Sequence, residues 1–237
     1  MTYNARLRDL VVPPRIARLP VTDTGYPVPF FCQWFDGDEP CEDGRGVPDL
    51  RIQGIGKAQR AVRHKLCWVC GNTLGVHLAF NIGPMCTVNR ISGEPPSHRE
   101  CAEFSARICP FLSQPRMRRN EAERPETKEA PGVMLAHNPG VSCVWVTRSY
   151  RIVDAAAGGK GSLFQIGEPE AVAWYTQGRG ATRAEIMAGF DKGLPALRAL
   201  AHQDVDSADS LAVLDRMLRA AMRFVPHEGS AWQRVMA

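Results

Sequence analysis

The chain has 237 residues, of which 44% are hydrophobic and 23% charged, and its formal net charge is +4. This composition is typical of a globular protein with one large domain or two small ones. No run approaches the roughly 18 uninterrupted apolar residues of a membrane helix, so we expect no membrane association. The N-terminus lacks the apolar segment of a secretory signal, which favours the cytoplasm, where thiols stay reduced.

The first half of the chain begins with a stretch rich in proline, glycine and aromatic residues. Proline and glycine disfavour helix, so the aromatic run at 30–35 predicts a strand that ends at the acidic turn 36–40. A short helix is expected over 57–66, because most of these residues are good helix formers. A further strand is expected over 76–82.

A second helix is predicted to begin near His98. Ser97 and Glu100 have the spacing of a capping box, and Pro110 should end the helix. The next segment, 113–140, combines many charges with four prolines and has little apolar surface to offset the entropy of ordering. We expect it to be a connector that is mobile or lies on the surface.

The last hundred residues contain both strand and helix patterns. Segments 141–147 and 163–166 predict strands, and Glu168-Pro169 predicts the start of a short helix through Tyr175.

Two longer helices follow in the sequence. Thr182 and Glu185 have capping-box spacing before a helix that should kink or restart at 193–195. The final helix is expected over 208–224, with an apolar face formed by Leu211, Leu214, Leu218 and Ala221.

These elements predict an α+β fold in three regions. Residues 1–112 form a small β-rich N-terminal region with a metal-binding unit at about 67–110. Residues 113–140 form the connector, and residues 141–237 form an α+β part with a C-terminal helical cluster.

The strongest motif is a set of four potential metal ligands, Cys67-x-x-Cys70 followed by His98-x-x-Cys101. Structural zinc takes four ligands in a tetrahedron, usually thiolates with one or two imidazoles. The turn Cys67–Gly71 lets two sulfurs converge, while His98 and Cys101 share a face at the start of the predicted helix, whose dipole favours thiolate. A Cys-x-x-Cys turn followed by two ligands from a helix resembles the treble-clef zinc finger, although the insert between Gly71 and His98 is long for that motif.

Other assignments of the cysteines remain open. Cys86 or Cys109 could replace one of the four ligands, or join Cys67, Cys70 and Cys101 around an iron–sulfur cluster. The cysteines could also be buried free thiols, which behave as small hydrophobic residues. Because the intervals do not fit the ferredoxin pattern, Zn2+ is the preferred cofactor.

Several short segments are similar to a group of uncharacterised bacterial and phage-associated proteins. The matching segments are Leu66-Cys67-Trp68-Val69-Cys70-Gly71, Gly83-Pro84-Met85-Cys86, Val88-Asn89-Arg90, Glu94-Pro95-Pro96-Ser97-His98 and Cys109-Pro110-Phe111-Leu112, with a weaker one at 174–197. This resemblance covers about half the chain and implies no activity.

A basic stretch precedes and surrounds the first ligand pair. No acidic residue occurs between Asp49 and Glu94. Cations with a nearby aromatic ring can follow a nucleic-acid backbone and stack on a base. The candidate nucleic-acid-binding residues are Lys57, Arg60, Arg63, Lys65, Trp68 and Arg90. The competing interpretation is an amphipathic helix whose charges only face water.

Three functional hypotheses follow. The preferred one is a non-catalytic, zinc-stapled binding protein whose basic face meets nucleic acid or an acidic protein. The first alternative is an enzyme, a metal-dependent hydrolase or a nucleic-acid-modifying enzyme, with a pocket between the two halves and with His64, His77 or Cys86 contributing. The second is a protein–protein adaptor. No residue pattern identifies a catalytic residue.

Overall fold

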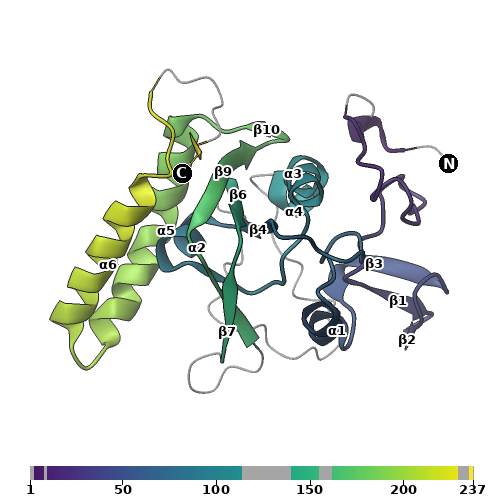
Figure 1. The fold of residues 1–237 in the computed structure, drawn as a ribbon, viewed down its shortest axis with the longest axis horizontal. Helices are drawn as coiled ribbons and strands as arrows, with labels where there is room; N and C mark the ends of the chain where they lie inside the picture. Colours follow the sequence, from purple (N-terminus) through teal and green to yellow (C-terminus); the bar gives the residue numbers. More distant parts are fainter. Residues whose placement is uncertain (1–2, 8–9, 114–139, 155–161, 229–234, 237) are drawn as a thin grey trace.

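The computed structural model describes residues 3–7, 10–113, 140–154, 162–228 and 235–236. The fold mixes helices and sheets, with the Cys/His group in the N-terminal part and a helical pair near the C-terminus, which confirms the expected α+β class (Figure 1). Almost all of the predicted connector, residues 114–139, lies outside the described residues. Within the described ranges, no helix has the length and apolar character needed to cross a membrane.

The centre of the molecule is an antiparallel sheet in the order β10-β9-β6-β4, with β11 also paired to β9. Its strands are β4 (Leu78–Ile82), β6 (Ser142–Thr147), β9 (Pro169–Thr176), β10 (Arg179–Gly180) and β11 (Val235–Met236). Strand β4 of the first predicted region therefore pairs with β6 of the third. The boundaries proposed for these regions remain a prediction.

Both faces of the central sheet are covered. Because side chains alternate along a strand, Cys143 and Trp145 of β6 face one side and Val144 and Val146 the other. The first side packs against three helices: α2 (Pro84–Asn89), α5 (Arg183–Gln203) and α6 (Ser207–Met222). The second side packs against helix α3 (Arg99–Ile108), which ends before the short helix α4 (Pro110–Ser113).

Helix α3 contacts the sheet through small side chains. Ala102 and Ala106 pack with Val144, Val146 and further small residues of β4 and β9. Another face of the same helix presents Cys101, Phe104 and Ile108 to a separate cluster that contains the N-terminal residues Leu7 and Ile16. The helix therefore connects the sheet to the Cys/His group.

Two smaller sheets complete the fold. One has the order β2-β1-β3 and consists of β1 (Cys32–Asp36), β2 (Glu39–Cys41) and β3 (Val47–Gln53), next to helix α1 (Lys57–His64). The other has the order β5-β8-β7 and consists of β5 (Ile91–Ser92), β7 (Tyr150–Asp154) and β8 (Ser162–Ile166). A 3-10 turn, Ala5–Leu7, lies near the N-terminus.

The segment predicted as a helix from Glu168-Pro169 through Tyr175 is strand β9, so that prediction was wrong. A short apolar run is ambiguous between helix and strand, and pairing with β6 decides the outcome here. Pro169 is the first residue of the strand, a position where the missing N–H is tolerated.

The two predicted capping boxes had different outcomes. Thr182 accepts a hydrogen bond from the Glu185 N–H, and the Glu185 side chain accepts one from the Thr182 N–H, which confirms the box at α5. At α3 the N-cap residue is His98 rather than Ser97, and no side chain caps the helix. At 193–195 the helix was expected to kink or restart. It does not restart, because α5 continues through Pro195, and the kink stays a prediction.

Glu185 provides a pH-dependent prediction. Its ion pair with Arg179 and its bonds to Thr182 outweigh partial burial and lower the pKa of the Glu185 carboxyl to about 2. Because a carboxylate with a lowered pKa stabilises the fold only while it is ionised, Glu185→Gln should lower the melting temperature at pH 7. Thermal unfolding should show this difference intact above about pH 4.5 and shrinking as the pH falls towards 2.

The matched control for that experiment is Asp191→Asn, which neutralises an exposed carboxylate further along α5. It should leave the melting temperature almost unchanged at pH 7. A Glu185→Gln variant that melts like the wild type at pH 7 would contradict the role of this cap.

Candidate metal centre

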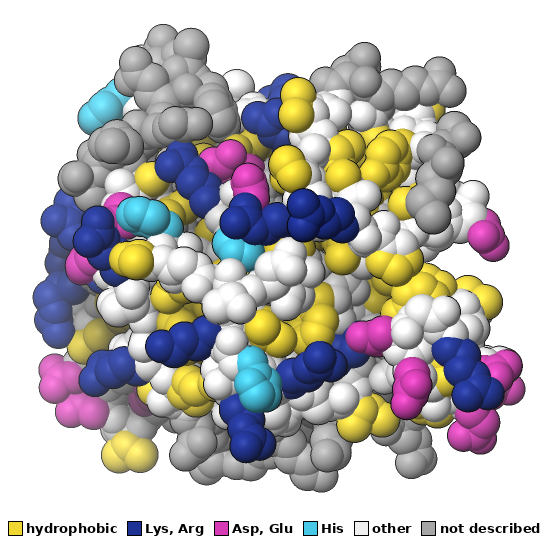
Figure 2. Space-filling model, turned by 45° about the vertical axis from the view of Figure 1, so that its right-hand side comes forward, with side chains coloured by type: hydrophobic (Ala, Val, Ile, Leu, Met, Phe, Trp, Pro, Cys, Tyr) yellow, Lys and Arg dark blue, Asp and Glu magenta, His cyan; other side chains and the backbone are white. Residues whose placement is uncertain are grey.

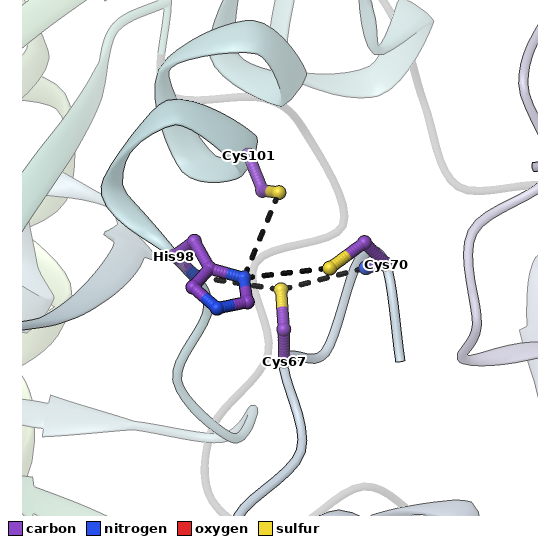
Figure 3. A group of neighbouring side chains, drawn as sticks. All are labelled: Cys67, Cys70, His98 and Cys101. Atoms are coloured by element: carbon purple, nitrogen blue, oxygen red, sulfur yellow. Dashed lines mark hydrogen bonds between the residues drawn. The ribbon is translucent and has the colours of Figure 1, made fainter. Parts of the chain in front are cut away.

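Four side chains converge between a turn of the chain and the start of helix α3. Cys67 and Cys70 belong to the turn after α1, His98 is the N-cap of α3, and Cys101 lies in its first helical turn. Figure 3 shows the three sulfurs and the imidazole directed towards a common centre. The ligand atoms all lie within 4.8 Å of one another, so this group could hold a metal ion.

The turn that carries the first two cysteines is closed by backbone hydrogen bonds. The Cys67 N–H donates to the Asn72 carbonyl at 2.7 Å, and the Gly71 N–H donates to the Cys67 carbonyl at 2.9 Å. Gly71 has a φ of 71°, and a Cβ at this position would lie 3.0 Å from the Phe30 ring. Glycine at this position therefore satisfies both the left-handed backbone and the close packing.

The imidazole of His98 is oriented for metal binding. Its Nδ1 lies 3.4 Å from the Cys70 sulfur and 4.0 Å from the Cys101 sulfur. Its Nε2 lies 3.0 Å from the Thr73 carbonyl oxygen, which can only accept a hydrogen bond. This contact places the proton of a neutral imidazole on Nε2 and leaves the Nδ1 lone pair facing the sulfurs.

Backbone and side-chain donors surround the sulfurs. The N–H groups of Cys70 and His98 point to the Cys67 sulfur at 3.4 and 3.3 Å, and the Asn72 side chain points to the Cys70 sulfur at 3.5 Å. Donors of this kind favour a thiolate over a thiol. Asn72 and Thr73 were not identified from the sequence, although both directly follow the Cys67–Gly71 turn.

The four ligands share protons unequally. Burial raises the pKa of the Cys67 thiol, but hydrogen bonds from Cys101, Cys70 and His98 together lower that pKa far below its usual value. A hydrogen bond between Cys101 and Cys67 raises the pKa of the Cys101 thiol. A second hydrogen bond, between His98 and Cys67, raises the pKa of the His98 imidazole. A metal ion bound by these groups would displace the protons that they share.

Three of the four side chains in the cluster are buried. Cys67 and Cys101 are completely buried and Cys70 is 7% exposed, whereas His98 is half-buried. The surrounding apolar side chains come from the N-terminal segment, the turn and α3, and include Leu7, Ile16, Val69, Phe104 and Ile108. Arg15 forms an ion pair with Glu100 beside the ligands.

The two alternate cysteine ligands lie elsewhere. Cys86 belongs to α2 and packs against the central core, while Cys109 is the C-cap of α3, at the opposite end of the helix from Cys101. Neither belongs to the metal-binding group. Burial raises the pKa of both thiols, so each is a poor nucleophile.

Lys57, the first of the candidate nucleic-acid-binding residues, has an internal role. Its ammonium group pairs with Asp43 and donates hydrogen bonds to the carbonyls of Phe30 and Cys32 at 2.7 and 2.9 Å. Only 11% of the side chain is exposed. Lys57 therefore attaches α1 to the small N-terminal sheet.

Trp68 and Arg90 are also engaged within the fold. Trp68 is 2% exposed, with its ring stacked on Phe31 at a centroid separation of 5.4 Å. Arg90 is the C-cap of α2 and pairs with Glu168. The three remaining candidates, Arg60, Arg63 and Lys65, are exposed at the end of α1 and just before the Cys67–Gly71 turn.

The side chains considered for catalysis are dispersed. His64 is exposed at the end of α1, and His77 is exposed and pairs with Glu170. Neither residue belongs to the metal-binding group. Cys86 is partly buried and packs against the central core, so the three residues form no common site among the described residues.

A matched pair of substitutions tests the ligand set. Cys101→Ser should reduce the metal content of the purified protein, because serine is a much poorer ligand for a soft metal ion than a thiolate. Cys109→Ser removes a thiol from the other end of the same helix and should leave the metal content unchanged. Elemental analysis measures both, and equal metal content in the two variants would contradict the assignment.

No protein-family model, curated protein or solved structure matches the chain. The function must therefore be inferred from the side chains themselves. These establish a Cys3His group at the N-terminus of α3 that could hold a metal ion.

Proposed function

We propose that this chain is a zinc-stapled, non-catalytic binding protein in which Cys67, Cys70, His98 and Cys101 hold one Zn2+. The geometry of the four ligand atoms is the observation that carries this proposal. Tetrahedral zinc with ordinary bond lengths places a sulfur and an imidazole nitrogen about 3.6 Å apart. The two S···Nδ1 distances at His98, 3.4 and 4.0 Å, lie on either side of that value.

The donor set and its burial support a structural role for the ion. Three thiolates and one imidazole suit zinc, whereas iron–sulfur clusters usually take four thiolates. A catalytic zinc keeps one position for water or substrate, but here the protein supplies all four ligands. The ion would compensate for a small apolar core by joining α3 to the turn and the N-terminal segment.

Zinc content and thermal stability test this proposal. The purified protein should contain one zinc per chain, and chelation should lower its melting temperature by about 10 °C, because loss of a structural ion costs several kcal/mol. Adding zinc back should restore the original value. Metal-free protein that melts at the same temperature as the untreated protein would contradict the proposal.

For the binding partner, we propose nucleic acid, contacted through Arg60, Arg63 and Lys65. These exposed cations lie within the stretch that has no acidic residue, next to the Cys67–Gly71 turn. The Arg60 guanidinium lies over the Phe30 ring, 5.7 Å from its centroid, which limits the motion of the side chain. Figure 2 shows Lys and Arg side chains across much of this face, with Asp and Glu side chains above the centre, at the left edge and at the lower right.

An electrophoretic shift assay tests this surface on the full chain with a short DNA duplex and its single strand. Three phosphate contacts predict that the logarithm of duplex affinity falls with the logarithm of salt concentration with a slope of about −2.7. Replacing Arg60, Arg63 and Lys65 together by Glu should abolish binding.

The matched control replaces Lys192, Arg216 and Arg219, exposed cations of α5 and α6, by Glu. It makes the same change in net charge and should retain binding. Equal loss in both variants would mean that net charge alone governs binding. Absence of binding at low salt would leave an acidic protein as the partner to test.

A further inference from the structure

One cation at the basic end of α1 lies over an aromatic ring. The Arg60 guanidinium carbon is 5.7 Å from the centroid of the Phe30 ring. Among the described residues, the Arg60 side chain has no ion pair and no hydrogen bond, and neither Arg63 nor Lys65 lies over a ring. The ring contact therefore distinguishes Arg60 from the two other cations proposed to meet nucleic acid.

The Phe30 ring is held from several sides. The Trp68 ring meets it edge-on, with the two centroids 6.4 Å apart. Gly71 packs so closely that a Cβ there would lie 3.0 Å from the Phe30 ring. The Phe30 N–H donates a hydrogen bond to the Val69 carbonyl at 2.7 Å. These contacts fix the ring to the Cys67–Gly71 turn, so it forms a rigid support for the cation above it.

The guanidinium of Arg60 remains available to a ligand. Lys57 also lies over the Phe30 ring, with its Nζ 5.2 Å from the centroid, but its charge is compensated by the ion pair with Asp43. Arg60 is exposed, and no described residue takes any of its five N–H donors. One side of the guanidinium is directed at the ring, which leaves the other side open to solvent.

A supported guanidinium favours one form of nucleic acid. Unstacked bases stack on aromatic rings and on guanidinium planes. In a duplex the faces of the bases are covered by their neighbours, so a protein surface reaches the phosphates but not those faces. Arg60 can therefore gain stacking energy only from a single strand, whereas cations without a ring contact phosphates in either form.

The cations are spaced to follow one strand. Arg60 and Arg63 are three residues apart on α1, which places their Cβ atoms about 5–6 Å apart on one side of the helix. Lys65 is the exposed C-cap residue of the same helix. A strand with a base on Arg60 can thus continue along α1 with its phosphates near Arg63 and Lys65.

We infer that this surface prefers single-stranded nucleic acid and that one base stacks on the Arg60 guanidinium above Phe30. The inference rests on the proposed nucleic-acid function and adds the strand state of the partner and the residue that distinguishes it. Because every base has a flat face, the surface accepts many sequences.

The test measures fluorescence anisotropy with the full-length, metal-loaded protein at physiological salt. Three labelled probes of equal length are compared: a DNA single strand, a strand whose sugars carry no bases, and a duplex. The single strand should bind at least about fivefold more tightly than the abasic strand, because stacking of one base is worth at least that factor. It should also bind more tightly than the duplex.

A matched pair of charge-conserving variants assigns the preference to Arg60. Arg60→Lys keeps the positive charge but removes the planar group, so the single strand and the abasic strand should bind with equal affinity. Arg63→Lys makes the same change one helical turn away and should keep the wild-type ratio of the two affinities. Thermal unfolding checks that both variants are folded, which is expected because both side chains are exposed.

The outcomes separate this inference from the function on which it rests. If wild type binds the single strand and the abasic strand equally, or the duplex more tightly, the inference is overturned and the nucleic-acid proposal stands. The same holds if Arg60→Lys keeps the preference or if Arg63→Lys loses it to the same extent. If no probe binds even at low salt, the proposed function is contradicted, and the inference fails with it.

Discussion

The packing of α3 against the central sheet is the contact on which the rest of the structure depends. Ala102 and Ala106 have no side-chain atoms beyond Cβ, so the helix can lie close to β6 and β9. The same helix presents Cys101 on another face, and His98 is its N-cap residue. The distance between helix and sheet therefore sets the position of half of the ligand group.

The metal-binding group and the N-terminal segment depend on each other. Of the eight buried members of their shared cluster, three are the cysteines of the Cys3His group and five are apolar side chains. The cluster is therefore much smaller than the core on the other side of the sheet. Four potential metal ligands and apolar side chains share one small volume, in which Leu7 and Ile16 also pack.

That Cys67, Cys70, His98 and Cys101 form one group could be predicted from the sequence, because Cys-x-x-Cys and His-x-x-Cys have local spacings that a turn and a helix convert directly into geometry. The capping box at Thr182 was predicted for the same reason. The strand conformation of β9 could not be predicted from the sequence, because it depends on pairing with β6. The internal role of Lys57 also escaped prediction, since Asp43 and two carbonyls engage it only in the folded chain.

The pairing of β4 with β6 has a kinetic consequence. Ile82 and Cys143 are partners in the register although a long stretch of chain separates them, whereas the Cys67–Gly71 turn is closed by neighbouring residues. Local contacts form faster than distant ones, because less loop entropy is lost. During refolding, the turn should be in place before the sheet that supports α3 is complete. The slow step should then be the pairing of β4 with β6.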